Sequence, residues 1–233
     1  MKTTESHPTV FVVDDDASVR KGLARLMKSA GYAVESFASA REFLDRISQG
    51  ESAGCVVLDI QMPELSGLEL QQKLKTFTPP ISIIFITGHG DIPISVRAMK
   101  DGATDFLPKP VGDEELLSAV RSALARNAEE RSSHARLREL QQRASTLTPR
   151  EREVMALVVR GQLNKQVAGI LGTGQQNIKV HRGRVMQKMK VTSLAELVVA
   201  AEKLGILARP MTPPALLSST AASAGGRISP PSA

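Results

Sequence analysis

Tryptophan is absent from this 233-residue sequence, and tyrosine and cysteine occur once each. Because aromatic residues make up only 3% of the chain, its hydrophobic cores must be built mainly from aliphatic side chains. The single cysteine, Cys55, cannot form a disulfide within the chain. The apolar residues Val56–Leu58 that follow it indicate a buried strand, so we interpret Cys55 as a core residue.

Long hydrophobic runs are also missing. Ile81–Ile86 is among the longest apolar stretches, far short of the ~18 residues that suggest a membrane span. The first residues, Met1–Glu5, lack the apolar segment of a signal peptide. We therefore expect a cytoplasmic protein without a membrane partner.

Positive charge is concentrated at the C-terminal end. The formal charge is −3 over residues 1–127, +1 over residues 128–147 and +8 over residues 148–233. A length of 233 residues suits two domains, at ~100–200 residues each. A cationic domain favours a polyanionic partner such as nucleic acid, although a membrane surface or simple solubility would give the same excess.

The first half alternates short β-like runs with helix-period segments, which is typical of βα units around a parallel sheet. We predict an α/β fold with a doubly wound, five-stranded parallel sheet over residues 1–127. In the first helix, apolar residues recur at helical spacing, and Gly31 follows as a residue able to adopt positive φ. The strands are expected at Thr9–Val13, Ala33–Phe37, Cys55–Leu58, Ser82–Ile86 and Asp105–Leu107, with helices beginning near Ala17, Ala40, Leu65, Ile92 and Asp113.

A long helix is expected between the domains. Residues 114–143 contain neither proline nor glycine, and beyond Ala128 they are highly charged, which indicates an exposed helical linker over residues 128–146. A coiled-coil dimerisation segment is the alternative, but Leu124, Leu137 and Leu140 do not sustain a heptad pattern. Residues 208–233 are dominated by proline, alanine, serine and glycine and are expected to be disordered.

Polar residues follow the predicted strands at the edge where an open parallel sheet binds ligands. Asp14–Asp16 follow the first strand, Asp59 the third, Thr87 the fourth and Lys109 the fifth. Clustered carboxylates repel one another unless a hard, oxygen-preferring cation such as Mg²⁺ neutralises them. Asp16 alone has a simpler interpretation as the N-cap of the next helix. Together these residues predict a magnesium site.

Four segments resemble the receiver signature of two-component response regulators over residues 8–125. They are Val12–Asp16, Leu58–Pro63, Ile86–Gly90 and Asp105–Pro110. The resemblance implies that Asp59 accepts a phosphoryl group from a sensor histidine kinase. A carboxylate is a competent nucleophile toward a phosphoryl group only when metal and cationic side chains cancel charge on the transferred oxygens.

The same resemblance assigns roles to the other residues of this site. Asp15 and Asp59 would bind Mg²⁺ directly, Asp14 would act mainly through water, and the Gln61 carbonyl would complete the protein ligands. Lys109 would supply the fixed cation, and Lys109–Pro110 would form a cis peptide bond. Thr87 would donate its hydroxyl to the phosphoryl group, and Phe106 would turn inward as that hydroxyl moves.

The C-terminal part predicts an all-α helix-turn-helix domain over residues 147–207. Thr148-Pro149-Arg150-Glu151 is a capping box that starts a helix, and Gly161 and Gly172 mark turns. In the third helix, Gln175–Met189, ~100° per residue gives two different faces. Ile178, His181, Val185 and Met189 form the core face, whereas Gln176, Lys179, Val180, Gly183, Arg184 and Gln187 form a surface that could read DNA.

Residues 147–206 resemble the LuxR-type helix-turn-helix, and in combination with this receiver the chain resembles the FixJ subgroup. The resemblance implies that the third helix enters the major groove of double-stranded DNA, with Lys179 and Val180 near base edges. Arg182, Arg184 and Lys165 would contact phosphates. Thr173–Asn177 departs from the usual pattern, so the preferred base sequence cannot be transferred.

We therefore predict a phosphorylation-dependent, sequence-specific transcriptional activator that forms a homodimer when phosphorylated, with RNA polymerase as a further partner. Two alternatives remain open from the sequence. One is a DNA-binding regulator that works without phosphorylation. The other is a Mg²⁺-dependent phosphotransfer enzyme, which the short loops disfavour because they offer no substrate pocket.

Overall fold

The computed structural model describes residues 8–49, 53–78, 80–88 and 92–207. The chain divides into two compact units, Met1–Gln141 and Gln142–Ala233. The predicted disordered tail, residues 208–233, lies outside the described residues. Within the described part of the chain, no helix combines the length and the apolar character needed to cross a membrane.

The N-terminal unit contains a parallel sheet in the order β2-β1-β3-β4-β5. This confirms the predicted doubly wound sheet, because the chain winds first toward β2 and then from β1 through β3 to β5. The strands are β1 (Thr9–Val13), β2 (Ala33–Phe37), β3 (Gly54–Asp59), β4 (Ser82–Thr87) and β5 (Asp105–Pro108). The helices are α1 (Ala17–Ser29), α2 (Ala40–Ser48), α3 (Gly67–Leu74), α4 (Ile92–Lys100) and α5 (Asp113–Ser145).

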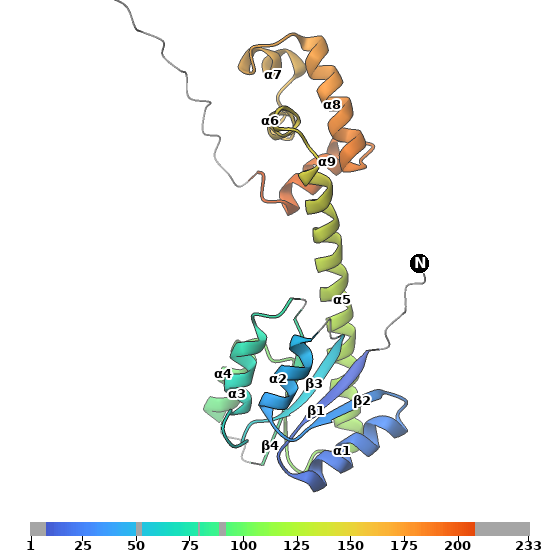
Figure 1. Ribbon diagram of the computed structural model, residues 1–233, viewed down its shortest axis with the longest axis vertical. Helices are drawn as coiled ribbons and strands as arrows, with labels where there is room; N and C mark the ends of the chain where they lie inside the picture. Colours follow the sequence, from blue (N-terminus) through green and yellow to red (C-terminus); the bar gives the residue numbers. More distant parts are fainter. Residues whose placement is uncertain (1–7, 50–52, 79, 89–91, 208–233) are drawn as a thin grey trace, which may run out of the picture. The chain divides into compact units, whose positions relative to one another are not determined.

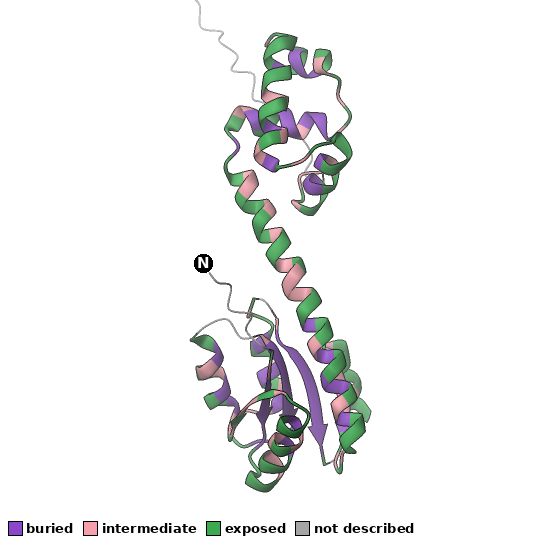
Figure 2. Cartoon of the chain, turned by 90° about the vertical axis from the view of Figure 1, so that its right-hand side faces the viewer, coloured by how far each residue is buried: buried purple, intermediate pink, exposed green. Residues whose placement is uncertain are grey.

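Helices cover both faces of this sheet (Figure 1). On one face, α1 and α5 pack on side chains such as Val12, Val57 and Ile84. On the other face, α2, α3 and α4 pack on side chains that include Phe11 and Phe85. The three central strands, β1, β3 and β4, are almost completely buried, as expected of a parallel sheet covered on both sides (Figure 2).

Local signals in the sequence fix most helix ends. The Asp16 carboxylate accepts hydrogen bonds from the amides of Ser18 and Val19 and caps α1, and Gly31 has a φ of 86° beyond the end of this helix. The predicted start of α3 at Leu65 was wrong by two residues. Ser66 forms a capping box with Glu69, so the helix begins at Gly67.

Helix α5 is a single helix of 33 residues. It starts in the N-terminal unit and continues through the segment that was expected to be the linker. Its first half is buried at five positions, the last of them Asn127. Beyond Asn127 no residue of α5 is buried (Figure 2). The helix does not break at the predicted boundary between residues 127 and 128, because its sequence contains no helix-breaking residue there.

The C-terminal unit contains α6 (Pro149–Val158), α7 (Asn164–Ile170), α8 (Gln175–Met189) and α9 (Leu194–Lys203). The predicted capping box at Thr148 and Glu151 is confirmed, and the turn residues Gly161 and Gly172 both have positive φ. The core is aliphatic and draws on all four helices, with Val154, Met155, Leu157, Val167, Ile178, Val185, Met189 and Leu197 all buried.

Candidate functional site

Three carboxylates meet at the C-terminal edge of the sheet. Asp14 and Asp15 follow β1, and Asp59 is the last residue of β3. One oxygen of each lies within 4.8 Å of the others. Asp14 is fully buried and Asp59 is 7% exposed, whereas Asp15 faces solvent. The fold thus gathers the oxygen ligands that a hard divalent cation prefers.

Lys109 bridges two of these carboxylates. Its Nζ lies 2.8 Å from Asp14 Oδ2 and 2.9 Å from Asp59 Oδ2. The backbone holds the residue in place, because the Lys109 amide donates a 2.7 Å hydrogen bond to the Thr87 carbonyl at the end of β4. The Lys109–Pro110 peptide bond is cis. The Lys109 ammonium, 95 residues after Asp14 in the sequence, is therefore held against Asp14 and Asp59.

The charges of this cluster do not balance. Burial raises the pKa of Asp14 above its ordinary value, and the hydrogen bonds from Lys109 and from the Asp16 amide only partly oppose this shift. Burial lowers the pKa of Lys109, but its hydrogen bonds with Asp14 and Asp59 outweigh that effect, so the net shift is upward. One ammonium thus contacts two of three clustered carboxyl groups, so the cluster holds more acidic groups than cations.

Thr87 and Phe106 lie on the neighbouring strands. Thr87 is the buried last residue of β4, one position beyond Ile86, which pairs with Asp59. Phe106 lies in β5 opposite Phe85, and the two ring centroids are 6.4 Å apart. Phe106 is half-buried and packs against the core on this face of the sheet, and its role in a switch stays a prediction.

The backbone amide of Gln61 lies beside the acidic cluster. This amide donates a 3.3 Å hydrogen bond to Asp59 Oδ1, while the Gln61 side chain is exposed. The role of its carbonyl as a metal ligand stays a prediction.

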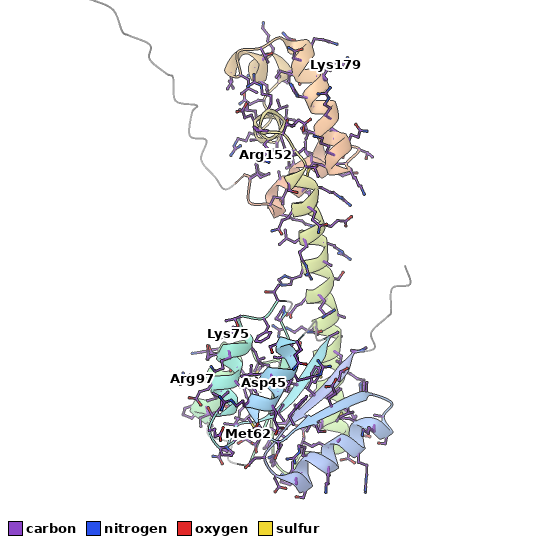
Figure 3. All side chains as sticks on the ribbon, viewed as in Figure 1. Asp45, Met62, Lys75, Arg97, Arg152 and Lys179 are labelled. Carbon is purple, nitrogen blue, oxygen red and sulfur yellow. The ribbon has the colours of Figure 1, made fainter. Side chains whose placement is uncertain are left out.

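Helix α8 has the two faces that the sequence predicts. Ile178, Val185 and Met189 are buried, and His181 is half-buried with its Nδ1 enclosed. All six residues of the predicted reading surface are exposed, among them Lys179 (Figure 3) and Val180, which is 46% exposed. An apolar side chain left this open on a helix is suited to contact with a thymine methyl group.

The two other residues predicted to contact phosphates are Lys165 on α7 and Arg182 on α8. Lys165 is exposed on α7. Arg182 is half-buried, and its Nη1 donates a 3.3 Å hydrogen bond to Asn164 Oδ1 at the start of α7. Arg182 therefore helps to hold α8 against α7, in addition to its predicted role.

Two family models cover most of the chain. Residues 10–121 match the response regulator receiver domain, and residues 145–201 match the bacterial regulatory proteins of the luxR family. The transcriptional regulatory protein FixJ of Bradyrhizobium diazoefficiens is 42% identical over 205 residues, which are 88% of this chain and 98% of FixJ. The chain is a two-component response regulator of the FixJ subgroup. Its C-terminal domain is a LuxR-type DNA-binding domain, so the protein is a transcriptional regulator.

Other relatives of this response regulator agree with that assignment. Nodulation protein W of B. diazoefficiens is 49% identical over 199 residues, covering 85% of this chain and 87% of the relative. Response regulator protein TodT of Pseudomonas putida is 45% identical over 195 residues, covering 84% and 86%.

Solved structures of response regulators have the same fold as this chain. The structure of response regulator StyR has a TM-score of 0.75 and 51% identity, covering 85% of this chain and all of that chain. Full-length FixJ from B. japonicum has a TM-score of 0.52 and 42% identity, covering 86% and 98%.

Sequence reasoning missed two residues that shape the receiver site. Arg20 Nη1 donates a 2.6 Å hydrogen bond to the Asp14 carbonyl and so holds the acidic loop against α1. Gly67 lets α3 start directly beside β3, because a Cβ there would lie 2.3 Å from the Asp59 carbonyl oxygen. No signal in the sequence singles out Arg20, whereas the capping pattern at Ser66 indicates the helix start.

A buried ion pair in the DNA-binding domain was also missed. Glu151 is 2% exposed, and its Oε2 accepts a 2.6 Å hydrogen bond from Lys188 Nζ. The same ammonium donates to the Thr146 carbonyl at 3.0 Å. This contact ties α8 to the start of α6 and to the end of the linker helix.

Proposed function

We propose that this response regulator is phosphorylated on Asp59 by a sensor histidine kinase, and that phosphorylation controls its binding to promoter DNA. The observation that carries the proposal is the position of Lys109, whose ammonium touches both Asp14 and Asp59. A fixed cation at hydrogen-bond distance from a carboxylate is what phosphoryl transfer to that carboxylate requires.

The donor set suits Mg²⁺. Asp14, Asp15 and Asp59 supply carboxylate oxygens within 4.8 Å of one another, and the Gln61 carbonyl follows Asp59 by two residues. A bound Mg²⁺ would neutralise negative charge on the transferred phosphoryl group. The excess of carboxylates over ammonium groups described above is the electrostatic reason to expect a cation here.

The residues of the chain divide the work of the transfer. An Asp59 oxygen would form the bond to phosphorus while the phosphorus–nitrogen bond to the kinase histidine breaks. Lys109 would stabilise charge on the phosphoryl oxygens, and the Thr87 hydroxyl would donate a hydrogen bond to one of them. Movement of Thr87 would leave space for Phe106 to turn inward. The same site would react with small phosphodonors, which makes the receiver the catalyst of its own phosphorylation and dephosphorylation.

The output step would bring two copies together on DNA. Helix α4 carries an exposed apolar row at helical spacing, with Ile92 76%, Val96 46% and Met99 44% exposed. Such a row on the α4–β5 side is suited to pairing of two receivers, and a symmetric dimer matches a roughly palindromic site. The regulator would then act as an activator through RNA polymerase.

Phosphorylation can be tested with acetyl phosphate and Mg²⁺ by mass spectrometry. Asp59→Asn should abolish labelling and the accompanying increase in promoter protection. Asp45→Asn is the matched control, because Asp45 is exposed on α2 (Figure 3) and lies outside the acidic cluster. Equal labelling of Asp59→Asn and wild type would overturn the proposal, and repeated turnover of small phosphomonoesters would favour an enzyme instead.

DNA contacts can be tested through the salt dependence of binding. Arg184→Ala should weaken binding to all sequences and reduce the slope of log K against log salt by about 1. Lys179→Ala should in addition reduce the discrimination between bases at one position of the DNA site by ~1–3 kcal/mol. Lys203→Ala removes an equal charge from α9 and should leave both quantities unchanged. Identical behaviour of all three variants would contradict the assignment of α8 as the reading helix.

A further inference from the structure

Helix α1 of the receiver carries positive charge without any negative charge. Its 13 residues include four cations and no carboxylate, whereas α2 carries two cations and two carboxylates. The receiver as a whole is acidic, with a formal charge of −3 over residues 1–127. The basic helix is therefore a local exception within an acidic domain. Its four cations are Arg20, Lys21, Arg25 and Lys28.

All four cations line one groove, which lies where α1 packs beside β2, the edge strand of the sheet (Figure 1). The rest of the lining consists of Ala24, Ser29 and Ser36. Among the residues that the structure describes, no acidic side chain lines this groove. Glu35, the neighbour of Ser36, points to the other face of the sheet, where it lies 2.8 Å from Arg46 of α2. The positive charge is thus not offset within the lining.

Three of the four cations are accessible to a partner. Lys21, Arg25 and Lys28 are exposed, and within the described part of the chain their side chains form no ion pair or hydrogen bond. Arg20 differs, because its Nη1 already donates a hydrogen bond to the Asp14 carbonyl. A groove with three uncompensated cations attracts an anionic partner.

The spacing of the three cations favours an extended anion. At ~1.5 Å and ~100° per residue, Lys21, Arg25 and Lys28 form one stripe about 10 Å long on α1. A lone phosphate ion spans only part of this length. A DNA strand, by comparison, carries one phosphate per ~3.4 Å of helix axis, so a stripe of this length matches about three successive phosphates.

The chemistry of the lining favours a nucleic acid over a protein. Protein interfaces are centred on apolar and aromatic side chains, whereas Ala24 is the single apolar residue in the described lining of this groove. Lysine, arginine and hydroxyl side chains are the groups that contact phosphates of nucleic acids. A contact of this kind depends on the backbone of the duplex and carries no sequence information.

We infer that the groove on α1 is a second DNA-contacting surface, which binds the phosphate backbone of the duplex that the C-terminal domain holds. Only residues 146–148 separate α5 from α6, so DNA bound by the C-terminal domain is tethered to the receiver. Tethering raises the effective concentration of the duplex around the groove and offsets the acidity of the receiver. The contact adds affinity and salt dependence to the sequence-specific contacts of α8.

The salt dependence of DNA binding by the full-length protein tests this inference. The probe is a random-sequence duplex about four helical turns long. A triple variant with Lys21→Gln, Arg25→Gln and Lys28→Gln should reduce the slope of log K against log salt by about 2–3 and weaken binding at least about tenfold at low salt. Arg20 stays unchanged in this variant because it holds the loop of Asp14.

A second triple variant controls for the loss of net charge. Arg41→Gln, Lys73→Gln and Arg121→Gln remove the same three charges from exposed positions on α2, α3 and α5. This variant should keep the slope and the affinity of wild type, because its substitutions lie outside the groove. An equal change of slope in both triple variants, or no change in the groove variant, would overturn the inference.

Lysine acylation followed by mass spectrometry gives a test on wild type that does not depend on the folding of variants. The same duplex should protect Lys21 and Lys28 from acylation and leave Lys73 on α3 reactive. Protection of Lys179 reports on α8 in the same spectrum, so a failure of the α8 assignment is distinguishable from a failure of this inference. Unprotected Lys21 and Lys28 at a saturating concentration of duplex would overturn it.

Discussion

Replacing Lys188 by methionine should destabilise the DNA-binding domain. The change leaves Glu151, a carboxylate that is 2% exposed, without its 2.6 Å ionic partner. Loss of one partner of a fully buried pair costs ~3–5 kcal/mol. The Lys188 side chain is 33% exposed, and the Thr148 amide still donates to Glu151 at 2.9 Å, so we expect about 2 kcal/mol. For a domain of this size that corresponds to a decrease of roughly 8–16 °C in Tm.

The stability contributed by the Glu151–Lys188 pair should depend on pH in a direction that the pKa of Glu151 determines. The hydrogen bond from Lys188, and after it that from the Thr148 amide, holds the pKa of Glu151 below its ordinary value. A lowered folded-state pKa contributes stability that is fully present above the unfolded pKa of about 4.3 and is lost as the pH falls through the folded value. The difference in unfolding free energy between wild type and Lys188→Met should therefore be constant from neutral pH to about pH 5.5. It should become smaller below pH 4.

Calorimetry is the suitable assay. The chain has no tryptophan, and its single tyrosine, Tyr32, lies in the receiver domain, so intrinsic fluorescence does not report on the DNA-binding domain. A double-mutant cycle with Glu151→Gln isolates the coupling energy of the pair. A cost below about 0.5 kcal/mol, or a difference that persists undiminished at low pH, would refute the reasoning.

Three further variants test the packing of the receiver. Gly67→Ala should destabilise the domain by ~1–3 kcal/mol and slow labelling of Asp59, because the added Cβ would lie 2.3 Å from the Asp59 carbonyl oxygen. Gly22→Ala in α1, where a Cβ meets nothing within 4 Å, should instead raise stability by ~0.5–1 kcal/mol, and denaturant unfolding measures both. Asn127→Ala should cost ~2–3 kcal/mol, because the Asn127 Oδ1 is the partner of the buried Gly54 amide at 3.2 Å. Faster hydrogen exchange of that amide should accompany the loss, and unchanged exchange would contradict it.

Periodicity and turn residues were sufficient to predict the fold of both units. They were less reliable at strand ends, because Asp59 and Thr87 are polar and seemed to terminate the hydrophobic runs of β3 and β4. In the structure both residues complete their strands and are buried. The sequence signal fails here because polar side chains occupy buried strand positions that apolar residues would otherwise fill.

Contacts between distant polar residues could not be predicted. Glu151 and Lys188 are 37 positions apart, and the capping box that the sequence predicts for Glu151 does not involve Lys188. Asn127 falls at the predicted end of the receiver, where no sequence pattern marks it, yet it joins Gly54 to the carbonyl of Pro80 inside the domain. Only the packing of the helices decides which polar residues are enclosed.

The Glu151 carboxylate and the aspartate cluster at the sheet edge differ in their charge balance. The Glu151 carboxylate accepts hydrogen bonds from one ammonium group, that of Lys188, and from the Thr148 backbone amide, so its buried charge is compensated and the contact adds stability. At the sheet edge, one ammonium contacts two of three clustered carboxyl groups, and Asp14 is completely enclosed.

Apolar residues at the sheet edge would remove the cost of enclosing these carboxyl groups, so stability alone does not explain this cluster. Lys109 supplies one ammonium to this cluster of three carboxyl groups, which leaves an excess of acidic groups. This excess of carboxyl groups is the physical reason to expect a cation beside Asp59.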